Sequence, residues 1–309
     1  MDPNGRQRRK RGRAVHGWVV LDKPLGLGST SAVAAVRRLI DARKAGHAGT
    51  LDPLATGILP IALGEATKTV PFLMDAAKSY AFDIAFGTST ETLDAEGEAT
   101  GESEARPARE ALEAVLLRFI GDVAQVPPKY SAIKIGGKRA YDLARAGEAV
   151  EIEVRTVRID ALRLDAYDGE TASLSVDCGK GTYVRSLARD ICQALSTDTV
   201  RIEGHVSKLR RTRVGPFGLE RSLTLDGLEE LCDGARADEG LLPLSTALDD
   251  IPVLAVTEDQ QLSLKQGRAI AASPSLPLSE WILAEAEGSP VALCQPRDSQ
   301  LWPKRVFNI

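Results

Sequence analysis

Cysteine is scarce in this chain, and its four cysteines stand far apart. They lie at Cys178, Cys192, Cys232 and Cys294, so no two of them form a C-x-x-C pair. Structural zinc sites and disulfide frameworks depend on closely or regularly spaced cysteines. The sequence therefore predicts neither a metal site nor disulfide bonds, which is typical of a protein of the reducing cytoplasm.

Long apolar stretches are missing as well, although 43% of the residues are hydrophobic. No run approaches the roughly 18 apolar residues that a membrane-spanning helix needs. The basic N-terminus also lacks the apolar segment that follows the charged residues of a signal peptide. We therefore expect no membrane span and no signal peptide, and a chain of 309 residues is long enough for two domains or one large one.

Excess charge is small, with a net charge of −4, but its distribution is uneven. Residues 1–13 carry six basic side chains and one acidic one, and the remainder is correspondingly more acidic. Local basic patches, not total charge, bind phosphates, although most single Lys and Arg side chains are simply solvated. Two basic clusters within the acidic remainder favour an RNA partner: Lys129, Lys134, Lys138, Arg139 and Arg145, and then Arg201, Lys208, Arg210, Arg211 and Arg213.

Hydrophobic periodicity predicts a mixture of strands and helices. Residues 78–86 alternate, with Tyr80, Phe82 and Ile84 on one face, which indicates a half-buried strand. Thr30 or Ser31 can cap a helix with an apolar face. Residues 87–110 are predicted to be a mobile acidic connection. Further strands are expected at 18–21, 174–178 and 204–215, and further helices at 111–120, from about 182 onward, and within 221–249.

Strands and helices that do not alternate regularly predict an α+β fold rather than a doubly wound sheet. We divide the chain into a disordered basic tail, a large domain, and a small β-rich domain. A segment of mixed Pro, Gly, Lys and Tyr, with a short helical piece around Tyr141–Ala146, is predicted to project from the large domain as an arm. The corresponding ranges are 1–15, 16–249, 250–309 and, for the arm, 121–147.

One stretch, residues 46–57, is richer in chemical information than any other. It places a single carboxylate, Asp52, among three glycines, a histidine and two threonines. Pro53 disfavours the helical conformation for Asp52, and glycines allow close approach of a ligand. An Asp-Pro pair is also an ordinary helix start, with the aspartate as cap and the proline in the first turn. The dipeptide alone leaves both interpretations open.

Three further motifs stand around this one in the chain. Val20–Gly26 reads VLDKPLG, Val126–Lys134 reads VPPKYSAIK, and Gly179–Ser186 reads GKGTYVRS. Together with Gly46–Gly64, GHAGTLDPLATGILPIALG, they resemble, in this order, the motifs of the bacterial tRNA pseudouridine-55 synthases, the TruB family. Where that family usually has a serine pair, this chain has Gly28-Ser29. Its last 60 residues resemble only faintly the small RNA-binding domain often found there.

The resemblance implies a fold, an activity and a set of site residues. The fold is a central mixed or antiparallel sheet flanked by helices, followed by a small β-rich, PUA-like domain. The activity is isomerisation of uridine to pseudouridine at position 55 in the T loop of tRNA. Asp52 matches the essential aspartate, Arg185 the arginine that keeps it ionised, and Tyr80 the tyrosine that stacks on the flipped base and could assist proton transfer at C5. The implied binding residues are His47 in the space left by the base, Tyr183 and Leu209 in the pocket wall, Lys23 in support of the loop, and Lys129, Lys134, Lys138 and Arg139 on the tRNA.

The reaction also limits what else the protein needs. Breaking N1–C1′, turning the uracil and forming C5–C1′ gains and loses no atoms, so we expect no cofactor and no metal. Taken without the resemblance, Tyr80 is a core aromatic, His47 a turn residue and Arg185 a surface arginine. The rival functions are a non-catalytic tRNA-binding or RNA-folding protein on the same scaffold, and a phosphate-ester hydrolase with an aspartate nucleophile. We expect a cytoplasmic monomer.

Overall fold

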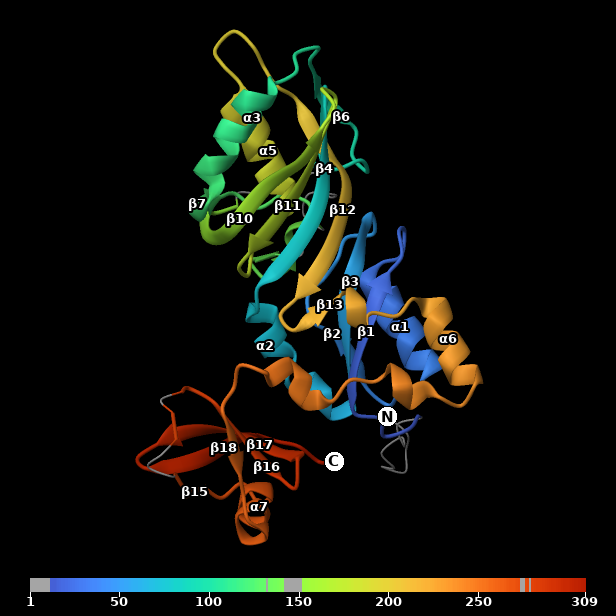
Figure 1. Cartoon of the computed structure of the whole chain (residues 1–309), viewed down its shortest axis with the longest axis vertical. Helices are drawn as coiled ribbons and strands as arrows, with labels where there is room; N and C mark the ends of the chain where they lie inside the picture. The colour runs from blue at the N-terminus through green and yellow to red at the C-terminus, as the bar shows by residue number, and fades with distance from the viewer. Residues whose placement is uncertain (1–11, 132, 142–151, 273–275, 278) are drawn as a thin grey trace.

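The computed structural model describes residues 12–309, apart from 132, 142–151, 273–275 and 278. Its largest element is a nine-stranded sheet that runs along the upper two thirds of the molecule in Figure 1. The central path of this sheet runs β1-β3-β12-β4-β11-β10-β7, with β2 on β3 and β13 on β12. The strands are β1 (Gly17–Lys23), β2 (Ala45–His47), β3 (Ala55–Leu63), β4 (Lys78–Phe86), β7 (Gly121–Gln125), β10 (Arg155–Tyr167), β11 (Thr171–Cys178), β12 (Gly204–Val214) and β13 (Phe217–Gly218).

The sheet is mixed, because one of its pairings is parallel and the others are antiparallel. The parallel contact joins β12 to β3 over Leu209–Arg211 and Ala55–Gly57. On its other side β12 runs antiparallel to β4 along most of its length. This single junction connects the two halves of the sheet, and it brings the loop before β3 next to β4.

Helices cover the two halves of the sheet separately (Figure 1). In the upper half, α3 (Arg109–Leu116) and α5 (Val184–Leu195) pack on β4, β10 and β11 around a core that contains Phe82 and Leu187. In the lower half, α1 (Ser29–Leu39) and α6 (Leu225–Asp233) enclose a second core with β1 and β3. The expected α+β architecture is therefore confirmed.

Several expected elements are confirmed at their predicted places. Strand β4 covers the predicted range 78–86, and its side chains alternate between buried and partly exposed as the sequence pattern requires. Strand β12 covers 204–214 and turns at Gly215 into β13. Helix α5 begins at Val184, with Tyr183 as its cap residue.

Three sequence predictions are wrong in detail. The cap of α1 is Gly28, without a side-chain hydrogen bond, so neither Thr30 nor Ser31 caps this helix. Residues 87–110 are not a featureless connection, because β5 (Thr88–Thr90) and β6 (Ala99–Glu102) pair within them. The predicted arm begins late, since residues 121–125 form β7 and pair with β10 in the main sheet. Polar sequence concealed these strands, because edge strands need little apolar surface.

The C-terminal residues form their own sheet and are also joined to the large domain. The sheet order is β14-β16-β17-β18-β15, with α7 (Glu258–Lys265) packed on it. Its strands are β14 (Val253–Ala255), β15 (Ile270–Ala271), β16 (Ile282–Ala286), β17 (Ser289–Arg297) and β18 (Gln300–Val306). Leu293 and Phe307 share an apolar cluster with Trp18 of β1, and Phe72 of α2 (Val70–Asp75) meets Trp281 edge to face at 5.3 Å. The small β-rich unit is thus confirmed, and it is firmly docked.

Within the part of the chain that the structure describes, no helix is both long and apolar enough to cross a membrane.

Candidate active site

Asp52 lies in the loop that joins β2 to β3. Pro53 and Leu54 form a turn that leads directly into β3, so no helix begins at the Asp-Pro pair. Ser29, the first residue of α1, holds this loop twice: its Oγ donates to the Leu51 carbonyl and accepts from the Leu51 N–H, both at 2.8 Å. The helix-cap interpretation of Asp52 is therefore excluded. The carboxylate lies on a loop that Ser29 holds in place through two hydrogen bonds to Leu51.

Lys23 also supports the Asp52 loop, through hydrogen bonds to backbone carbonyls. Its side chain is fully buried, and Nζ donates to the carbonyls of Pro24, Leu27 and Pro53 at 2.9, 2.7 and 3.2 Å. Burial lowers the pKa of this ammonium, and the Asp52 carboxylate opposes that effect. An ammonium has three donors, and all three are used here. This geometry fits support of the Asp52 loop and leaves no ammonium proton for RNA.

An ion pair links Asp52 to the start of α5. Arg185 Nη2 lies 2.8 Å from Asp52 Oδ2; the arginine side chain is 6% exposed and the aspartate 40%. Arg185 Nη1 lies 3.4 Å from Asp94 Oδ2, and the guanidinium also donates to the Thr92 and Tyr130 carbonyls. Arg185 is thus not a surface arginine. It presents one nitrogen to a carboxylate that itself remains open to solvent.

Asp52 and Arg185 line a cavity of about 350 Å³, with Tyr80, Tyr183 and Leu209 in its wall. Three larger hollows, of about 730, 520 and 450 Å³, lie elsewhere: the first where α2 meets the C-terminal domain, the second beside β5 and the end of α5, and the third within the C-terminal domain. None of them is lined by Asp52. We take the smaller cavity as the site, because a paired carboxylate and two tyrosines converge there.

The two tyrosines of the cavity differ in how they are held. Tyr80 comes from β4, and burial raises the pKa of its phenol while the charge of Arg211 opposes that rise. Burial also raises the pKa of Tyr183. Tyr183 N–H donates to Gln125 Oε1 at 2.8 Å, which fixes the entry to α5. Both rings are neutral phenols at pH 7.

Lys78 also lines the cavity, although sequence reasoning did not select it. Nζ donates to the carbonyls of Leu73, Met74 and Ala76, at the end of α2. Burial, reinforced by the charge of Arg211, lowers the pKa of Lys78 to about 8.

His47 lies at the end of β2 and is not among the residues that line the cavity. Burial, followed by the positive charge of Arg211, lowers the pKa of its imidazole, so the ring is neutral at pH 7. Its Nδ1 is buried without a hydrogen-bond partner in the described part of the chain. Its expected role in filling the space of a flipped base stays a prediction.

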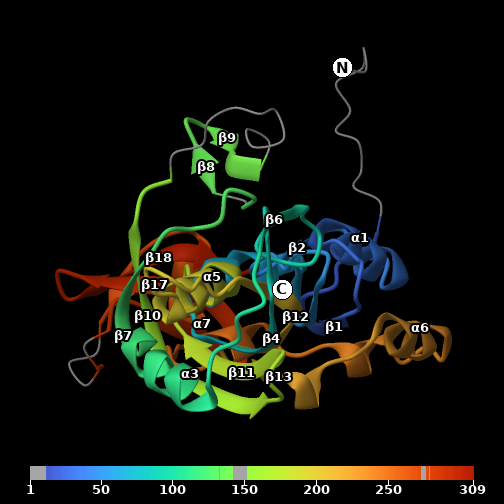
Figure 2. The same ribbon diagram turned by 90° about the horizontal axis from the view of Figure 1, so that it is seen from above.

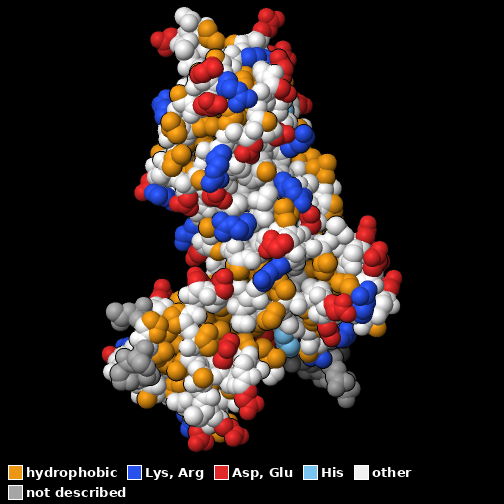
Figure 3. Space-filling model, viewed as in Figure 1, with side chains coloured by type: hydrophobic (Ala, Val, Ile, Leu, Met, Phe, Trp, Pro, Cys, Tyr) orange, Lys and Arg blue, Asp and Glu red, His pale blue; other side chains and the backbone are white. Residues whose placement is uncertain are grey.

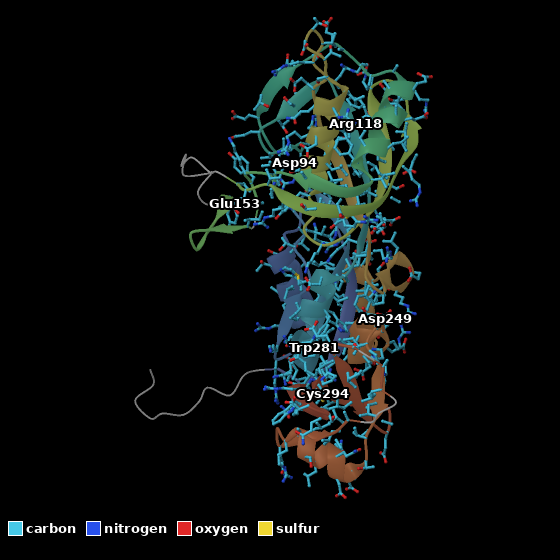
Figure 4. The ribbon with its side chains drawn as sticks, turned by 90° about the vertical axis from the view of Figure 1, so that its left-hand side faces the viewer. Asp94, Arg118, Glu153, Asp249, Trp281 and Cys294 are labelled. Carbon is cyan, nitrogen blue, oxygen red and sulfur yellow. The ribbon has the colours of Figure 1, made fainter. Side chains whose placement is uncertain are left out.

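The predicted arm stands out from the body as a hairpin (Figures 2 and 4). Strands β8 (Lys134–Ile135) and β9 (Lys138–Arg139) are joined by Gly136 and Gly137 at φ +57° and +87°, the conformation of a two-residue hairpin turn that glycine favours. In Figure 4 the hairpin projects from the body on the side of Asp94. Except for Tyr141, the helical piece predicted around Tyr141–Ala146 lies outside the described residues.

The base of the arm is bound to α5 and to the cavity. Ser186 Oγ donates to the Val126 carbonyl at 2.8 Å, and Ser131 and Ile133 line the cavity next to Tyr183. Lys129 is exposed on the same segment. The arm therefore begins at the edge of the candidate site.

The second basic cluster is not exposed as a whole, which corrects the sequence prediction for one of its members. Arg211 is only 2% exposed and cannot meet RNA phosphates. Arg210 forms a bidentate salt bridge with Asp22, and Lys208 forms an ion pair with Asp83 at 3.1 Å. Side chains that follow one another on a strand point to opposite faces, so closeness in sequence did not imply a common surface. On the face seen in Figure 3, basic and acidic side chains are interspersed.

Sequence reasoning missed Asp94, Arg211 and Gln125 as parts of this site. Asp94 was hidden in the acidic segment 87–110, and Arg211 was assigned to the surface. The described residues contain no group of three or more His, Cys, Asp and Glu side chains that could hold a metal ion.

The fold can be compared with solved structures. A chain in the crystal structure of a Cbf5-Nop10-Gar1 complex aligns with a TM-score of 0.73 at 24% identity, covering 99% of this chain and 92% of that one. A chain in the structure of an H/ACA RNP bound to a substrate RNA containing 2′-deoxyuridine gives 0.72 at 22% identity, covering 100% and 93%. The fold is that of the pseudouridine synthases, with the C-terminal β-domain included.

Family models and sequence relatives identify the family. The TruB family pseudouridylate synthase N-terminal domain matches residues 37–184, and the tRNA pseudouridylate synthase B C-terminal domain matches 185–249. The tRNA pseudouridine synthase B of Caulobacter sp. strain K31 is 54% identical over 98% of this chain and 99% of that protein. The enzyme of the same name from Bradyrhizobium diazoefficiens is 52% identical over 99% and 89%. This chain belongs to the TruB family of pseudouridylate synthases, which are isomerases.

Proposed function

We propose that this enzyme converts uridine to pseudouridine at position 55 in the T loop of tRNA. The observation that carries the proposal is the Asp52–Arg185 ion pair at 2.8 Å on the wall of a cavity that also holds Tyr80. Its sequence relatives are named for this class of reaction on tRNA. The position within tRNA, the base flipping and the role of Asp52 are parts of the proposal.

The chemistry proceeds in three stages on the uridine. The N1–C1′ bond breaks while positive character develops at C1′, which an ionised carboxylate can stabilise or attack. The freed uracil turns within the cavity, C5 bonds to C1′, and the proton leaves C5 as N1 gains one. Arg185 places a positive charge 2.8 Å from the carboxylate of Asp52. The groups that we assign to these reaction steps, Asp52, Tyr80 and Arg185, all line the cavity.

Access of the base to Asp52 requires that it leave the folded RNA loop. A cavity of about 350 Å³ lined by Tyr80, Tyr183 and Leu209 provides aromatic and aliphatic surface for one extruded base. In our proposal Tyr80 stacks on the base and moves the C5 proton, and His47 fills the vacated space.

The C-terminal domain would extend the RNA contact as a PUA-like module, and residues 16–249 would form the catalytic domain. We further propose a cytoplasmic monomer that needs neither cofactor nor metal.

A direct assay tests the reaction. Purified protein is incubated with an unmodified tRNA transcript, and pseudouridine is located by primer extension after carbodiimide treatment. We expect one new stop, at position 55, and no stop with a matched transcript that carries cytidine there. Tight tRNA binding with no stop would instead support the non-catalytic RNA-binding function, and stops at several uridines would remove the claim of a single target.

We predict that the arm contributes much of the affinity for tRNA. Replacing Lys134, Lys138 and Arg139 by Ala should flatten the dependence of log affinity on log salt by roughly one unit per lost phosphate contact. The chemical step at saturating enzyme should change much less, because the hairpin stands outside the cavity. Filter binding across a salt series, beside single-turnover rates, measures both effects.

The matched control removes three exposed arginines that sit on other surfaces and pair with acidic residues. We expect no change of slope when Arg109, Arg163 and Arg236 are replaced together; their partners are Glu113, Asp177 and Glu239. Equal slopes for the arm variant and wild type would show that the arm is not an RNA contact. Deletion of residues 1–13 should weaken binding less than the arm substitutions, since a basic tail adds only diffuse attraction.

A further inference from the structure

Arg211 is a buried cation beneath the catalytic loop, and the mechanism above does not use it. It lies on β12 between Gly57 of β3 and Tyr80 of β4, and it is 2% exposed. Among the described residues, no Asp or Glu forms an ion pair with it within 4.0 Å. A buried charge without a counter-ion is unfavourable unless dipoles compensate it. The groups that compensate this charge therefore indicate what Arg211 does.

Backbone carbonyls on both sides of Asp52 surround the guanidinium. Nη2 donates to Gly49 at 3.1 Å, Nη1 lies 3.4 Å from the Thr50 oxygen, and Nε donates to Ile58 at 2.7 Å. Gly49 and Thr50 precede Asp52 in the loop, and Ile58 follows it in β3. One planar side chain therefore joins the two ends of the loop, which a lysine cannot do because its donors radiate from one atom.

The main chain shows the same close fit between β12 and the loop. Gly57 has φ +96°, and a Cβ at this position would collide with the carbonyl oxygen of Arg211. Ser29 and Lys23 hold the loop from the side of α1, as described above, so Arg211 is its support from the side of β12. Without that support, the segment before Asp52 keeps the Ser29 contacts at Leu51 and the backbone hydrogen bond from Ala48 to Pro60, but Gly49 and Thr50 lose their link through the guanidinium to Ile58 of β3.

We propose that Arg211 is a positioning residue for the isomerisation, holding Gly49 and Thr50 so that the Asp52 carboxylate stays in the cavity beside Arg185. This inference rests on the proposed function, because its effect is expected in the chemical step. A reacting group displaced by about 1 Å can lose on the order of 10²-fold in rate. The loop contacts, and not charge alone, are what the reaction requires of Arg211.

The test is Arg211→Lys, which keeps the positive charge and removes the planar guanidinium that contacts three carbonyls. We expect the single-turnover rate at saturating enzyme to fall by about 30- to 300-fold. The dissociation constant for tRNA should stay within about 3-fold, since Arg211 cannot reach phosphates, and the melting temperature within about 5 °C. The matched control is Arg305→Lys, an arginine that donates to the Lys68 carbonyl at 2.9 Å in the contact with the C-terminal domain. This control should keep its full rate.

A rate within about 3-fold of wild type would overturn the proposal. A fall in rate accompanied by parallel losses of affinity and melting temperature would also overturn it, because Arg211 would then support the fold as a whole. Wild-type protein that makes no pseudouridine contradicts the proposed function itself, which the same assay shows before any variant is compared.

A second variant reaches the same loop if Arg211→Lys does not fold. Gly49 has φ +96°, a conformation that side chains rarely adopt, and a Cβ would lie 3.5 Å from Arg211 Nη1. Gly49→Ala should therefore shift the loop with little steric conflict and lower the rate while leaving tRNA affinity intact. A Gly49→Ala enzyme at full rate would show that the geometry of this segment does not limit the reaction.

Discussion

Asp52→Asn is expected to abolish turnover and leave tRNA binding nearly unchanged. The amide has the shape of the carboxylate and can still accept a hydrogen bond from Arg185, which lies 2.8 Å from Asp52 Oδ2. It cannot act as a nucleophile, and it cannot stabilise positive charge at C1′. Loss of such a group commonly costs on the order of 10³-fold or more in rate. Single-turnover formation of pseudouridine at saturating enzyme measures the loss, and filter binding measures affinity.

The matched control is Asp160→Asn, which neutralises an exposed carboxylate on β10 that pairs with Arg158 at 3.0 Å, away from the cavity. This variant should keep its full rate. Should Asp52→Asn retain more than about a tenth of the wild-type single-turnover rate, Asp52 has no direct part in the reaction. A loss of binding in proportion to the loss of rate would place Asp52 in recognition instead of chemistry.

The sequence predicted best where a pattern has one physical meaning. Strand β4 was placed at its observed ends, because alternating burial has a period of two only in a strand. The mixed sheet and the β-rich end of the chain followed from the absence of β-α alternation and from the family resemblance. The same resemblance selected Asp52 and Arg185, which lie 133 positions apart in the sequence and meet at 2.8 Å in the fold.

Contacts between polar segments that are distant in the chain could not be predicted from the sequence. Nothing in the acidic stretch 87–110 distinguishes Asp94 from its neighbours, yet it is 5% exposed and faces Arg185. Its burial depends on the return of β12 beside Leu93, which accepts a hydrogen bond from Val206. Local composition cannot report such pairing, because the partner strand lies more than a hundred residues away.

Arg211 was misassigned for a different reason. A run of basic residues suggests a basic surface, but β12 is an interior strand of the sheet, and its neighbouring side chains alternate between two faces. Arg210 pairs with Asp22, whereas Arg211 is buried and donates to backbone carbonyls on both sides of Asp52. Knowing that residues 204–214 form an interior strand would have been enough to separate the two.

Tyr80→Phe and Tyr80→Leu should both lose activity, to different extents. Burial raises the pKa of Tyr80 and the charge of Arg211 opposes only part of that rise, so the phenol keeps its proton at pH 7. In our proposal this hydroxyl relays the C5 proton, accepting one proton as it gives up its own. Phe keeps the ring and loses the hydroxyl, and general acid–base catalysis contributes about 10²- to 10⁴-fold. Leu loses the stacking surface too, which is worth about 1–3 kcal/mol per base.

We therefore expect a fall of about 10²-fold for Tyr80→Phe and a further fall of roughly tenfold for Tyr80→Leu. Single-turnover rates at saturating enzyme measure both, and Tyr167→Phe is the control, since this ring packs against Phe86 away from the cavity. An active Phe variant beside an inactive Leu variant would assign Tyr80 to stacking alone. Near-normal rates for both would return Tyr80 to the role of a core aromatic. The proton would then have to leave C5 by another route. Besides Tyr183 and the ion-paired Asp52, the described cavity wall offers Lys78, whose pKa burial lowers to about 8.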